Sequence, residues 1–393
     1  MPYSVGEAAT LGVVLLPSIL ALVFRSFARL RAPDERARAW GGFRLHTSLI
    51  LLCSAVGWWA IWVANRQSGN IARFEDTWFE PDPSVVARAA LFWLPPAAGL
   101  SAFLVVSFAT DGTLRNLRWG PMDTARQAWW RLFTSVIPLL VVALGFDELF
   151  AGSPRGAVYI VVAALLNRVG TVFLRLSSGF DPHSTKSGEL RNRTLALAHK
   201  MGVSVSRIYL VPAGKGHLTN AYASSRGAVA LTDNLGQFLN KPQIDSVIAH
   251  ELAHLRLHHL RKQILAAVVC FSVEATVVFS FRASSAVFRP WVDIALLVVP
   301  VLVMNFLSRR FEYAADRTAI EFTGDPASAI SALVNLHALS AAPIRWNRLT
   351  DLFQTHPAFP DRARAIADAG ELPPERVAEL LATTRLPRTV TKH

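Results

Sequence analysis

The chain has 393 residues, of which 52% are hydrophobic, and its formal net charge is +12. The mean hydropathy of +0.33 favours several membrane segments over one large soluble core. The arginines are spread over several loops and form no single basic patch, so we expect no nucleic-acid partner. Because Cys53 and Cys270 both fall in apolar runs, neither a disulfide nor a cysteine-based metal site is expected.

Seven apolar runs approach the roughly 20 residues that a helix needs to cross a bilayer. The expected spans are residues 8–24, 45–64, 89–109, 132–146, 156–174, 263–281 and 291–307. The fourth run is short and the fifth contains Asn167 and Arg168, so a re-entrant hairpin is the alternative for these two. The pattern predicts a mainly α, polytopic membrane protein with about seven transmembrane helices.

The charges of the connecting loops alternate along this part of the chain. The loops at 25–44 and 115–131 are rich in arginine, whereas those at 75–82 and 146–148 are acidic. By the positive-inside rule, the N-terminus lies outside, and everything after residue 174 is cytoplasmic. The preference for Arg over Lys suggests a GC-rich bacterial source, so the membrane expected is a bacterial plasma membrane.

After residue 174 the sequence becomes more polar. An amphipathic helix is predicted at 190–201, strands at 207–211 and 227–233, and a helix at 241–261 with Pro242 in its first turn. This last helix is expected to lead straight into the sixth span, and further helices follow at 308–322, 325–339 and 376–381. The predicted domains are a membrane domain (1–176), a first catalytic part (177–262), a transmembrane hairpin (263–307) and a second catalytic part with the C-terminal tail (308–393).

The stretch "HELAH" at 250–254 carries the clearest chemical signal. Residues four apart on a helix share one face, so His250 and His254 can present imidazole nitrogens to one Zn²⁺. Glu251 stands beside them, where it can take a proton from water. The alternative is an ordinary helix end that is rich in solvated histidines.

A catalytic zinc needs a third protein ligand. His258 lies four residues beyond His254, but one straight helix cannot easily place three successive turns around one ion. The metzincin spacing fails because Leu257 and Leu260 stand where that pattern has glycine and histidine. Glu312 fits better, with Asp316 four residues later to accept a hydrogen bond from a ligand imidazole. Alternatively, these two carboxylates form a solvated helix face that balances nearby arginines.

Four motifs together resemble the M48 family of membrane zinc metalloproteases, which includes the HtpX-type proteases and the CAAX prenyl proteases. They are "HELAH" at 250–254, "SRRFEYAADRTA" at 308–319, "NAYA" at 220–223 before "VALTDNL", and "THPAFPDRAR" at 355–364. The resemblance implies a zincin-like domain with a small sheet and one zinc per chain. The implied roles are zinc ligands at His250, His254 and Glu312, and the general base at Glu251.

The resemblance also implies residues that contact the substrate. Those lining the groove are Asn220, Ala221, Tyr222 and Ala223. His356 and Arg362 are similar to family positions near the scissile bond, where either is the candidate oxyanion partner. The alternative for His356 is a plain turn, because Pro357 follows it. Five spans before the catalytic part exceed the two of the HtpX pattern, whereas a total of seven is similar to the CAAX prenyl proteases.

These features predict a zinc-dependent endopeptidase acting at the cytoplasmic face on proteins or peptides associated with the lipid bilayer. Glu251 takes the proton of the attacking water and returns it to the leaving amine. The substrate is expected to add as an extended strand beside residues 220–231. Two alternatives remain: a zinc-domain sensor or regulator that cleaves one specific partner, and a non-proteolytic, transporter-like protein with an incidental histidine-rich helix.

Overall fold

The computed structural model divides the chain into two compact units, Met1–Gly179 and Phe180–His393. It describes residues 15–23, 26, 97–110, 120–131, 137–138, 141, 145, 153–159, 161–163, 165–166, 183–184, 187–211, 221–224, 227–280, 289–340, 351–352 and 354–382. The predicted span at 45–64, Asn167, Arg168, Asn220 and Cys53 lie outside these residues. The division into four domains stays a prediction.

The first unit is helical over most of its described residues. Residues 97–110 form a helix within the third expected span, and α5 (Pro121–Arg131) follows. The Gly120 N–H donates to Asp123 Oδ2 at 3.0 Å, which satisfies a backbone donor at the start of α5. This helix lies in the arginine-rich segment 115–131, for which the sequence predicts only a connecting loop.

Neither unit contains a helix, among the residues that the structure describes, with both the length and the apolar character needed to span a membrane. The seven-span arrangement therefore stays a prediction.

The second unit contains a four-stranded sheet with the order β1–β2–β4–β3. Its strands are β1 (His183–Ser184), β2 (Arg207–Val211), β3 (Ala221–Ser224) and β4 (Ala228–Thr232). The central pair, β2 and β4, is parallel, and β3 runs antiparallel to β4 at one edge. The expected strands at 207–211 and 227–233 are thus confirmed. The edge position of β3 leaves one side of that strand facing α10 (Lys241–Arg256).

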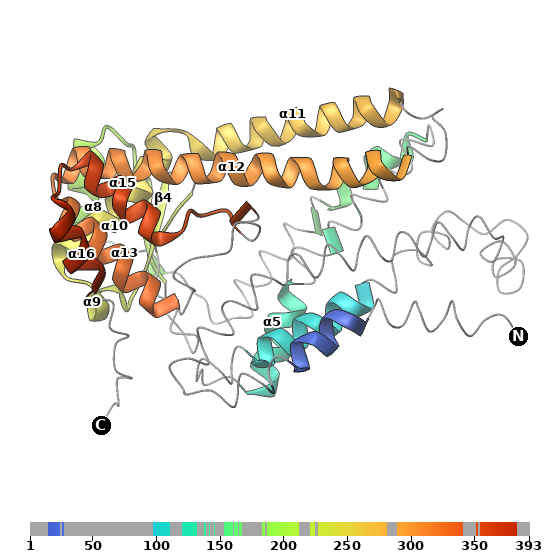
Figure 1. Cartoon of the computed structure of the whole chain (residues 1–393), viewed down its shortest axis with the longest axis horizontal. Helices are drawn as coiled ribbons and strands as arrows, with labels where there is room; N and C mark the ends of the chain where they lie inside the picture. The colour runs from blue at the N-terminus through green and yellow to red at the C-terminus, as the bar shows by residue number, and fades with distance from the viewer. Residues whose placement is uncertain are drawn as a thin grey trace, which may run out of the picture. The chain divides into compact units, whose positions relative to one another are not determined.

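Helices surround this sheet and enclose two apolar cores (Figure 1). Besides α10, they are α8 (Glu189–Lys200), α9 (Leu235–Phe238), α11 (His259–Ser280), α12 (Arg289–Thr323), α13 (Pro326–Ser340), α15 (Phe359–Ala369) and α16 (Pro374–Ala382). Ile248 and Leu252 of α10 are fully buried in the same apolar core as Val229 and Leu231 of the sheet. The second core joins α13, α15 and α16 through Ile330, Val334, Ile366 and other apolar side chains.

Local sequence explains where α10 begins, but not where it ends. Asn240 and Gln243 form a capping box, with reciprocal hydrogen bonds of 3.0 Å, and Pro242 lies in the first turn as predicted. The predicted continuous helix 241–261 is wrong, because α10 ends at Arg256 and His258 adopts a left-handed backbone with φ 54°. This break turns His259 inward, where its ring stacks on Phe311 of α12 at 4.4 Å.

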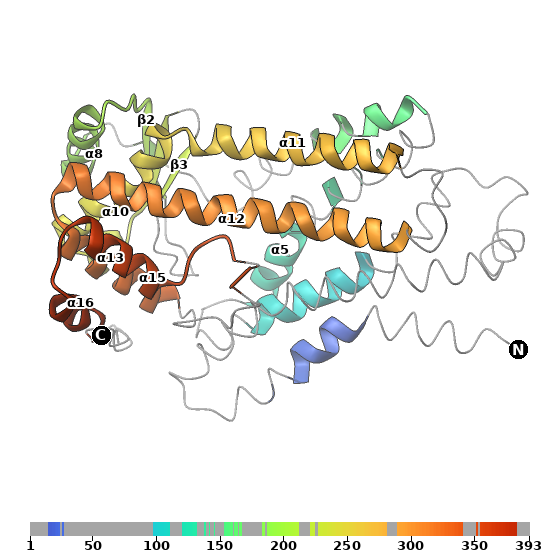
Figure 2. The same cartoon turned by 45° about the horizontal axis from the view of Figure 1, so that its top comes forward.

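The hairpin of α11 and α12 follows the break. The two helices lie side by side in Figures 1 and 2, and they pack against each other. Unlike the predicted pair of segments at 291–307 and 308–322, α12 is one continuous helix of 35 residues, with Pro300 inside it. The last part of this helix packs along α10 and brings Glu312 to the motif histidines.

Candidate metal centre and peptidase site

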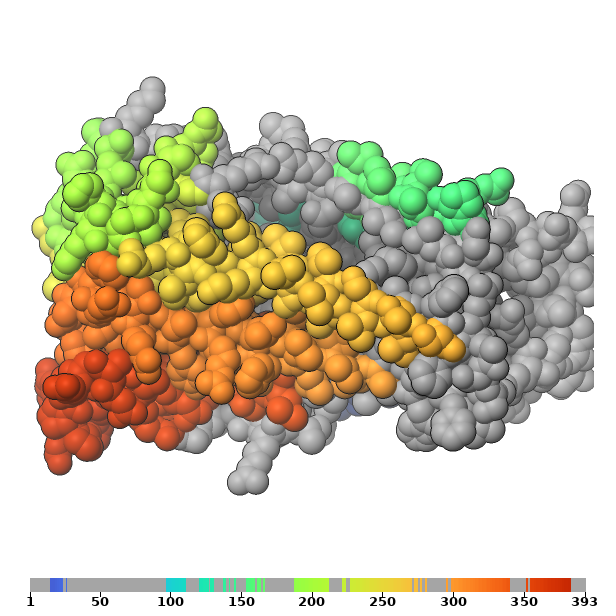
Figure 3. Space-filling view, turned by 90° about the horizontal axis from the view of Figure 1, so that it is seen from above, coloured from blue at the N-terminus to red at the C-terminus, as the bar shows by residue number. Residues whose placement is uncertain are grey.

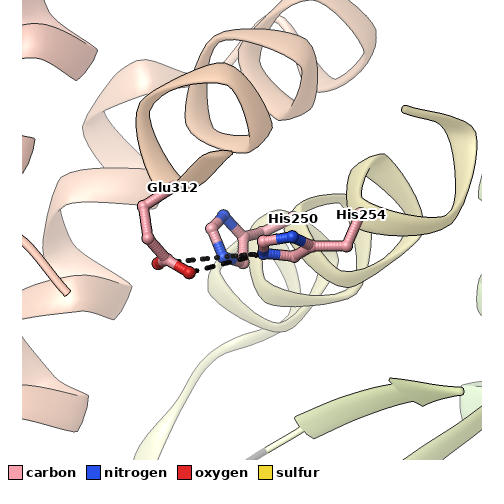
Figure 4. A group of neighbouring side chains, drawn as sticks. All are labelled: His250, His254 and Glu312. Atoms are coloured by element: carbon pink, nitrogen blue, oxygen red, sulfur yellow. Dashed lines mark hydrogen bonds and ion pairs between the residues drawn. The ribbon is translucent and has the colours of Figure 1, made fainter. Parts of the chain in front are cut away.

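The three side chains predicted to bind zinc converge between α10 and α12. His250 and His254 project from the same face of α10, and their Nε2 atoms lie 3.1 Å apart. Glu312 comes from α12 and points at both imidazoles (Figure 4). Its carboxylate oxygens lie 3.6 Å from His250 Nε2 and 3.6 Å from His254 Nε2. The structure thus brings together residues 62 positions apart in sequence, and the ligand atoms all fall within 4.8 Å of one another.

The spacing of these atoms fits a tetrahedral zinc. Two ligands at about 2.0–2.1 Å from such an ion lie about 3.3–3.4 Å apart. The two Nε2 atoms are 3.1 Å apart, and each lies 3.6 Å from a different oxygen of Glu312, so the nearest contacts of the three side chains are close to that value. Two imidazoles and one carboxylate are also a donor set of catalytic zinc sites, which keep one position open. The described residues therefore fit zinc in both chemistry and dimensions.

Each imidazole is held through its other nitrogen, which leaves Nε2 for the metal. His250 Nδ1 lies 2.9 Å from Asp316 Oδ1, as the sequence predicted for a carboxylate at that position. His254 Nδ1 lies 2.8 Å from Nδ1 of His259, which is buried. Such contacts fix the ring orientation and the tautomer of metal-binding histidines.

The sequence gives no role to His259, because its pattern predicts an unbroken helix over residues 241–261. On a straight continuation of α10, His258 rather than His259 lies four residues after His254 and shares its face. The break in the helix reverses this arrangement. His258 is exposed, and the His259 side chain lies beside His254. His258, the alternative third ligand, does not belong to the cluster. The available sequence signal was the pair of adjacent histidines, which indicates that one of them faces the core.

Arg362 of α15 connects the two carboxylates of α12. Its Nε and Nη2 bond both oxygens of Asp316 at 2.8 and 2.7 Å, and its Nη1 lies 3.0 Å from Glu312 Oε2. Only 14% of the side chain is exposed. The described contacts of Arg362 therefore hold the Asp316 and Glu312 carboxylates in place, and its predicted contact with the scissile bond stays a prediction.

His356 approaches the same cluster from the solvent side. Its Nδ1 lies 3.1 Å from Glu312 Oε2, while 67% of its side chain is exposed. This combination leaves the ring close to the ligand set and open to a substrate. The alternative of a plain turn does not account for the contact with Glu312.

The electrostatics favour the metal-binding ionisation state at His254 and Glu312. At His250 burial opposes protonation, but the Asp316 carboxylate raises the pKa of this ring. Burial and the charge of His250 lower the pKa of His254 to about 3, so that this ring is neutral. Burial opposes ionisation of Glu312, but the hydrogen bond from His356 and the charge of Arg362 bring the pKa of Glu312 well below its usual range. A neutral imidazole and an ionised carboxylate are the forms that ligate zinc.

Glu251 lies beside this cluster and contacts the edge strand. Its Oε2 accepts a hydrogen bond of 3.0 Å from the Ala223 N–H. Burial raises the pKa of Glu251, while the charge of His250 and the Ala223 N–H oppose the rise. Tyr222, the residue before Ala223, exposes 46% of its surface. The predicted base and the predicted substrate strand are thus adjacent.

Comparison with known proteins agrees with this geometry. The model of peptidase family M48 matches residues 184–369. A protease HtpX homolog of Campylobacter curvus is 30% identical over 208 residues, which cover 44% of this chain and 72% of that protein. One from Limosilactobacillus fermentum is 28% identical over 278 residues, which cover 58% of this chain and 91% of that protein.

The fold resembles that of S. mikatae Ste24p in its crystal structure. The TM-score is 0.57 at 15% sequence identity, and the superposition covers 92% of this chain and 98% of that chain. The likeness shows a mainly helical fold with a small sheet. Together with the family match and the relatives, it leads to one assignment: the chain belongs to peptidase family M48 and is a metalloendopeptidase.

Proposed function

We propose that this metalloendopeptidase uses one zinc ion, held by His250, His254 and Glu312, to cleave membrane-associated proteins or peptides at the cytoplasmic face. The observation that carries the proposal is the convergence of these three side chains with their supporting contacts from Asp316 and His259. When bound there, zinc supplies Lewis acidity that activates water and polarises a carbonyl group.

Glu251 is the proposed general base. It takes the proton of the attacking water and returns it to the leaving amine. A raised pKa suits this work, because a base near the operating pH both accepts and releases the proton readily. The Ala223 N–H holds the Glu251 carboxylate in one orientation beside the cluster. His356 is the proposed hydrogen-bond donor to the oxyanion that forms at the scissile carbonyl.

The edge strand β3 is the proposed docking place of the substrate backbone. An extended peptide can add to a sheet edge through main-chain hydrogen bonds, so affinity depends little on the peptide's sequence. Ala221 and Ala223 carry small side chains on β3, and Tyr222 is exposed there. Asn220, outside the described residues, is proposed to extend this strand contact.

The membrane location rests on the apolar surface of the hairpin. In Figure 3, atoms of α11 (yellow) and α12 (orange) form part of the surface on the side facing the viewer. More than half the surface is exposed at each of several large aliphatic residues of α11: Ile264, Leu265, Val268, Val269 and Val273. A contiguous apolar surface of this kind marks a contact with lipid or protein, and we assign it to the bilayer. Release of the protein from membranes by alkaline carbonate would contradict this location.

The decisive experiment compares wild type with Glu251→Gln. The full-length protein is purified, its zinc content is measured by mass spectrometry, and cleavage of casein is followed over time. We expect one zinc per chain in both proteins and a loss of activity in the variant by about 10²–10⁴-fold. Glu321→Gln is the matched control, because Glu321 is an exposed residue of α12, and this variant should keep full activity. Equal activity in wild type and Glu251→Gln refutes the mechanism.

A further inference from the structure

The chain just before His356 is fastened to α12 by two polar side chains. Arg309 Nη1 donates to the carbonyl oxygens of Asp351 at 2.6 Å and Gln354 at 3.1 Å, and it lies 3.4 Å from that of Leu352. One turn earlier on α12, the Asn305 amide donates to the Leu352 carbonyl at 3.3 Å. Arg309 in turn precedes Glu312 by three residues, so the same helix face carries the anchor and the proposed ligand.

The chain just after His356 is fastened in another way. Pro357, Ala358, Phe359 and Pro360 are all buried, and the last two begin α15. His356 therefore stands between a polar anchor and an apolar anchor while its own side chain remains 67% exposed. Besides the 3.1 Å contact of the ring with Glu312, these two anchors hold the backbone that carries it.

The polar anchor adds to a backbone hydrogen bond within the same segment, in which the Gln354 N–H donates to the Asp351 carbonyl at 3.1 Å. A hydrogen bond from a charged donor is stronger than one between neutral groups, so the Arg309 guanidinium holds these carbonyls firmly. Arg309 Nη1 alone lies within hydrogen-bonding distance of the carbonyl oxygens of residues 351, 352 and 354. Removing it loosens the whole segment at once.

We propose that Arg309 is a positioning residue of the peptidase: by holding the turn at residues 351–354, it keeps His356 beside Glu312. The inference rests on the proposed function of His356, and it adds a role for an arginine of the motif "SRRFEYAADRTA". A displacement of about 1 Å in a group that acts on the transition state can lower the rate about 10²-fold. Arg309 thus acts on turnover without touching the substrate.

The adjacent Arg310 supplies a matched control. It carries the same charge in the same helix, but it is exposed, and its guanidinium lies over the Phe306 ring at 5.3 Å. A non-specific effect of removing one arginine from this part of α12 should appear equally in Arg309→Ala and Arg310→Ala. An effect transmitted through the 351–354 turn should appear in Arg309→Ala alone.

The first measurement does not depend on activity. Amide hydrogen exchange is compared in the full-length wild type, Arg309→Ala and Arg310→Ala, using peptides that cover residues 351–358. We expect faster exchange in this segment for Arg309→Ala only, with α10 unchanged. Arg309→Lys should give an intermediate rate, because an ammonium group can donate to the carbonyls but lacks the planar fork. Identical exchange in all four proteins overturns the proposal.

The second measurement is a double-mutant cycle on the kinetics of peptide cleavage. We expect His356→Ala to lower kcat by about 10²-fold, in the range for loss of an oxyanion donor. Arg309→Ala should lower kcat by about 10-fold with KM and zinc content kept, and Arg309→Lys should recover part of the loss. In the His356→Ala background, Arg309→Ala should cost less than about 2-fold, because residues that act through one another are not additive.

The two proposals fail in different ways. Fully multiplied losses in the double variant show that Arg309 does not act through His356, which overturns the positioning role while leaving the peptidase function intact. A wild-type protein that binds zinc but cleaves nothing refutes the proposed function. In that case the exchange comparison still decides whether Arg309 holds the turn.

Discussion

His258 has a left-handed backbone, with φ 54°, between α10 and α11. This conformation costs a residue with a Cβ about 1–2 kcal/mol, whereas glycine adopts it freely. We therefore expect His258→Gly to raise the free energy of unfolding by about 1 kcal/mol, after allowing for the greater freedom of glycine in the unfolded chain. Thermal denaturation in detergent measures the effect. His258→Ala, which keeps a Cβ, is the control and should give no gain; a glycine variant less stable than the alanine variant contradicts the prediction.

His259 should matter for zinc affinity although it is not a proposed ligand. It holds His254 through the 2.8 Å contact between their Nδ1 atoms. We expect His259→Ala to weaken zinc binding by about 10–100-fold, the usual cost of losing a partner of a metal ligand. Competition with a chromophoric chelator measures the dissociation constant. His199→Ala removes an exposed histidine of α8 and should leave the constant unchanged; equal constants for the His259→Ala variant and wild type would show that the contact does not orient His254.

Residue types and spacing predicted much of this cluster. Helical spacing placed His250 with His254 and Glu312 with Asp316, but it left solvated helix faces open as alternatives, and the resemblance to the M48 family favoured the metal site. His259 could not be found in this way, because its position depends on a single φ angle at His258. A helical pattern that continues past the break gives no sign that the chain has turned.

Two helices, α12 and α15, are joined by the buried pair of Asp316 and Arg362. Arg362→Met should lower the free energy of unfolding by about 3–5 kcal/mol, because it leaves a buried carboxylate without its partner. Arg364→Met, also on α15, removes an arginine that is 56% exposed and pairs with Asp361, and it should cost no more than about 1 kcal/mol. Thermal denaturation of the three proteins provides the comparison, and similar losses in both variants contradict it.

The difference in stability between wild type and Arg362→Met should depend on pH, because it involves the Asp316 carboxylate. Burial opposes ionisation of Asp316, but Arg362 and the hydrogen bond with His250 lower its pKa to about 2, from 3.8 for the free group. A depressed carboxyl pKa stabilises the folded state at pH values above that of the free group, and the stabilisation is lost as the pH falls through the folded value. The gap between wild type and Arg362→Met should therefore narrow between about pH 4 and pH 2.

The sequence predicted the helices and strands of the second unit better than the junctions between them. Apolar patterns predicted β2, β4 and α10 correctly. Each of these segments buries one face, so its apolar residues recur with the period of a strand or a helix. The sequence did not indicate that α12 is one helix. Its apolar first part resembles a membrane span, whereas its charged second part resembles a helix of a soluble domain. The capping box of Asn240 and Gln243 carried a clear start signal, whereas the end of α10 had none.

Zinc should stabilise the whole fold, because its proposed ligands come from α10 and α12 and meet only in the folded chain. A ligand that binds only the native state at 1,000 times its dissociation constant adds about 4 kcal/mol. We expect chelation to lower the melting temperature of wild type and added Zn²⁺ to restore it, whereas Mg²⁺ does not. Glu312→Gln should respond much less to the chelator. A melting temperature unaffected by chelation contradicts the assigned ligand set.

The overall architecture was only partly accessible from the sequence. Order and spacing of four motifs were enough to predict a metallopeptidase domain with a small sheet. The pairing of β2 with β4 in parallel, with β3 at the edge, depends on contacts between distant segments that local patterns do not specify. Membrane insertion of the apolar runs depends on the surrounding lipid as well as on the chain, and it stays a prediction.

The unbroken course of α12 has a mechanical consequence. From Arg289 to Glu312 the helix extends about 35 Å, at 1.5 Å per residue. The first part of α12 can thus act as a lever on Glu312, the proposed third metal ligand, and on Arg309 one turn before it. Pro300 is the place where such an arm bends most easily, since proline removes a helical hydrogen bond. We expect a tilt of α12 that Pro300 does not absorb to displace Glu312 relative to the histidines of α10.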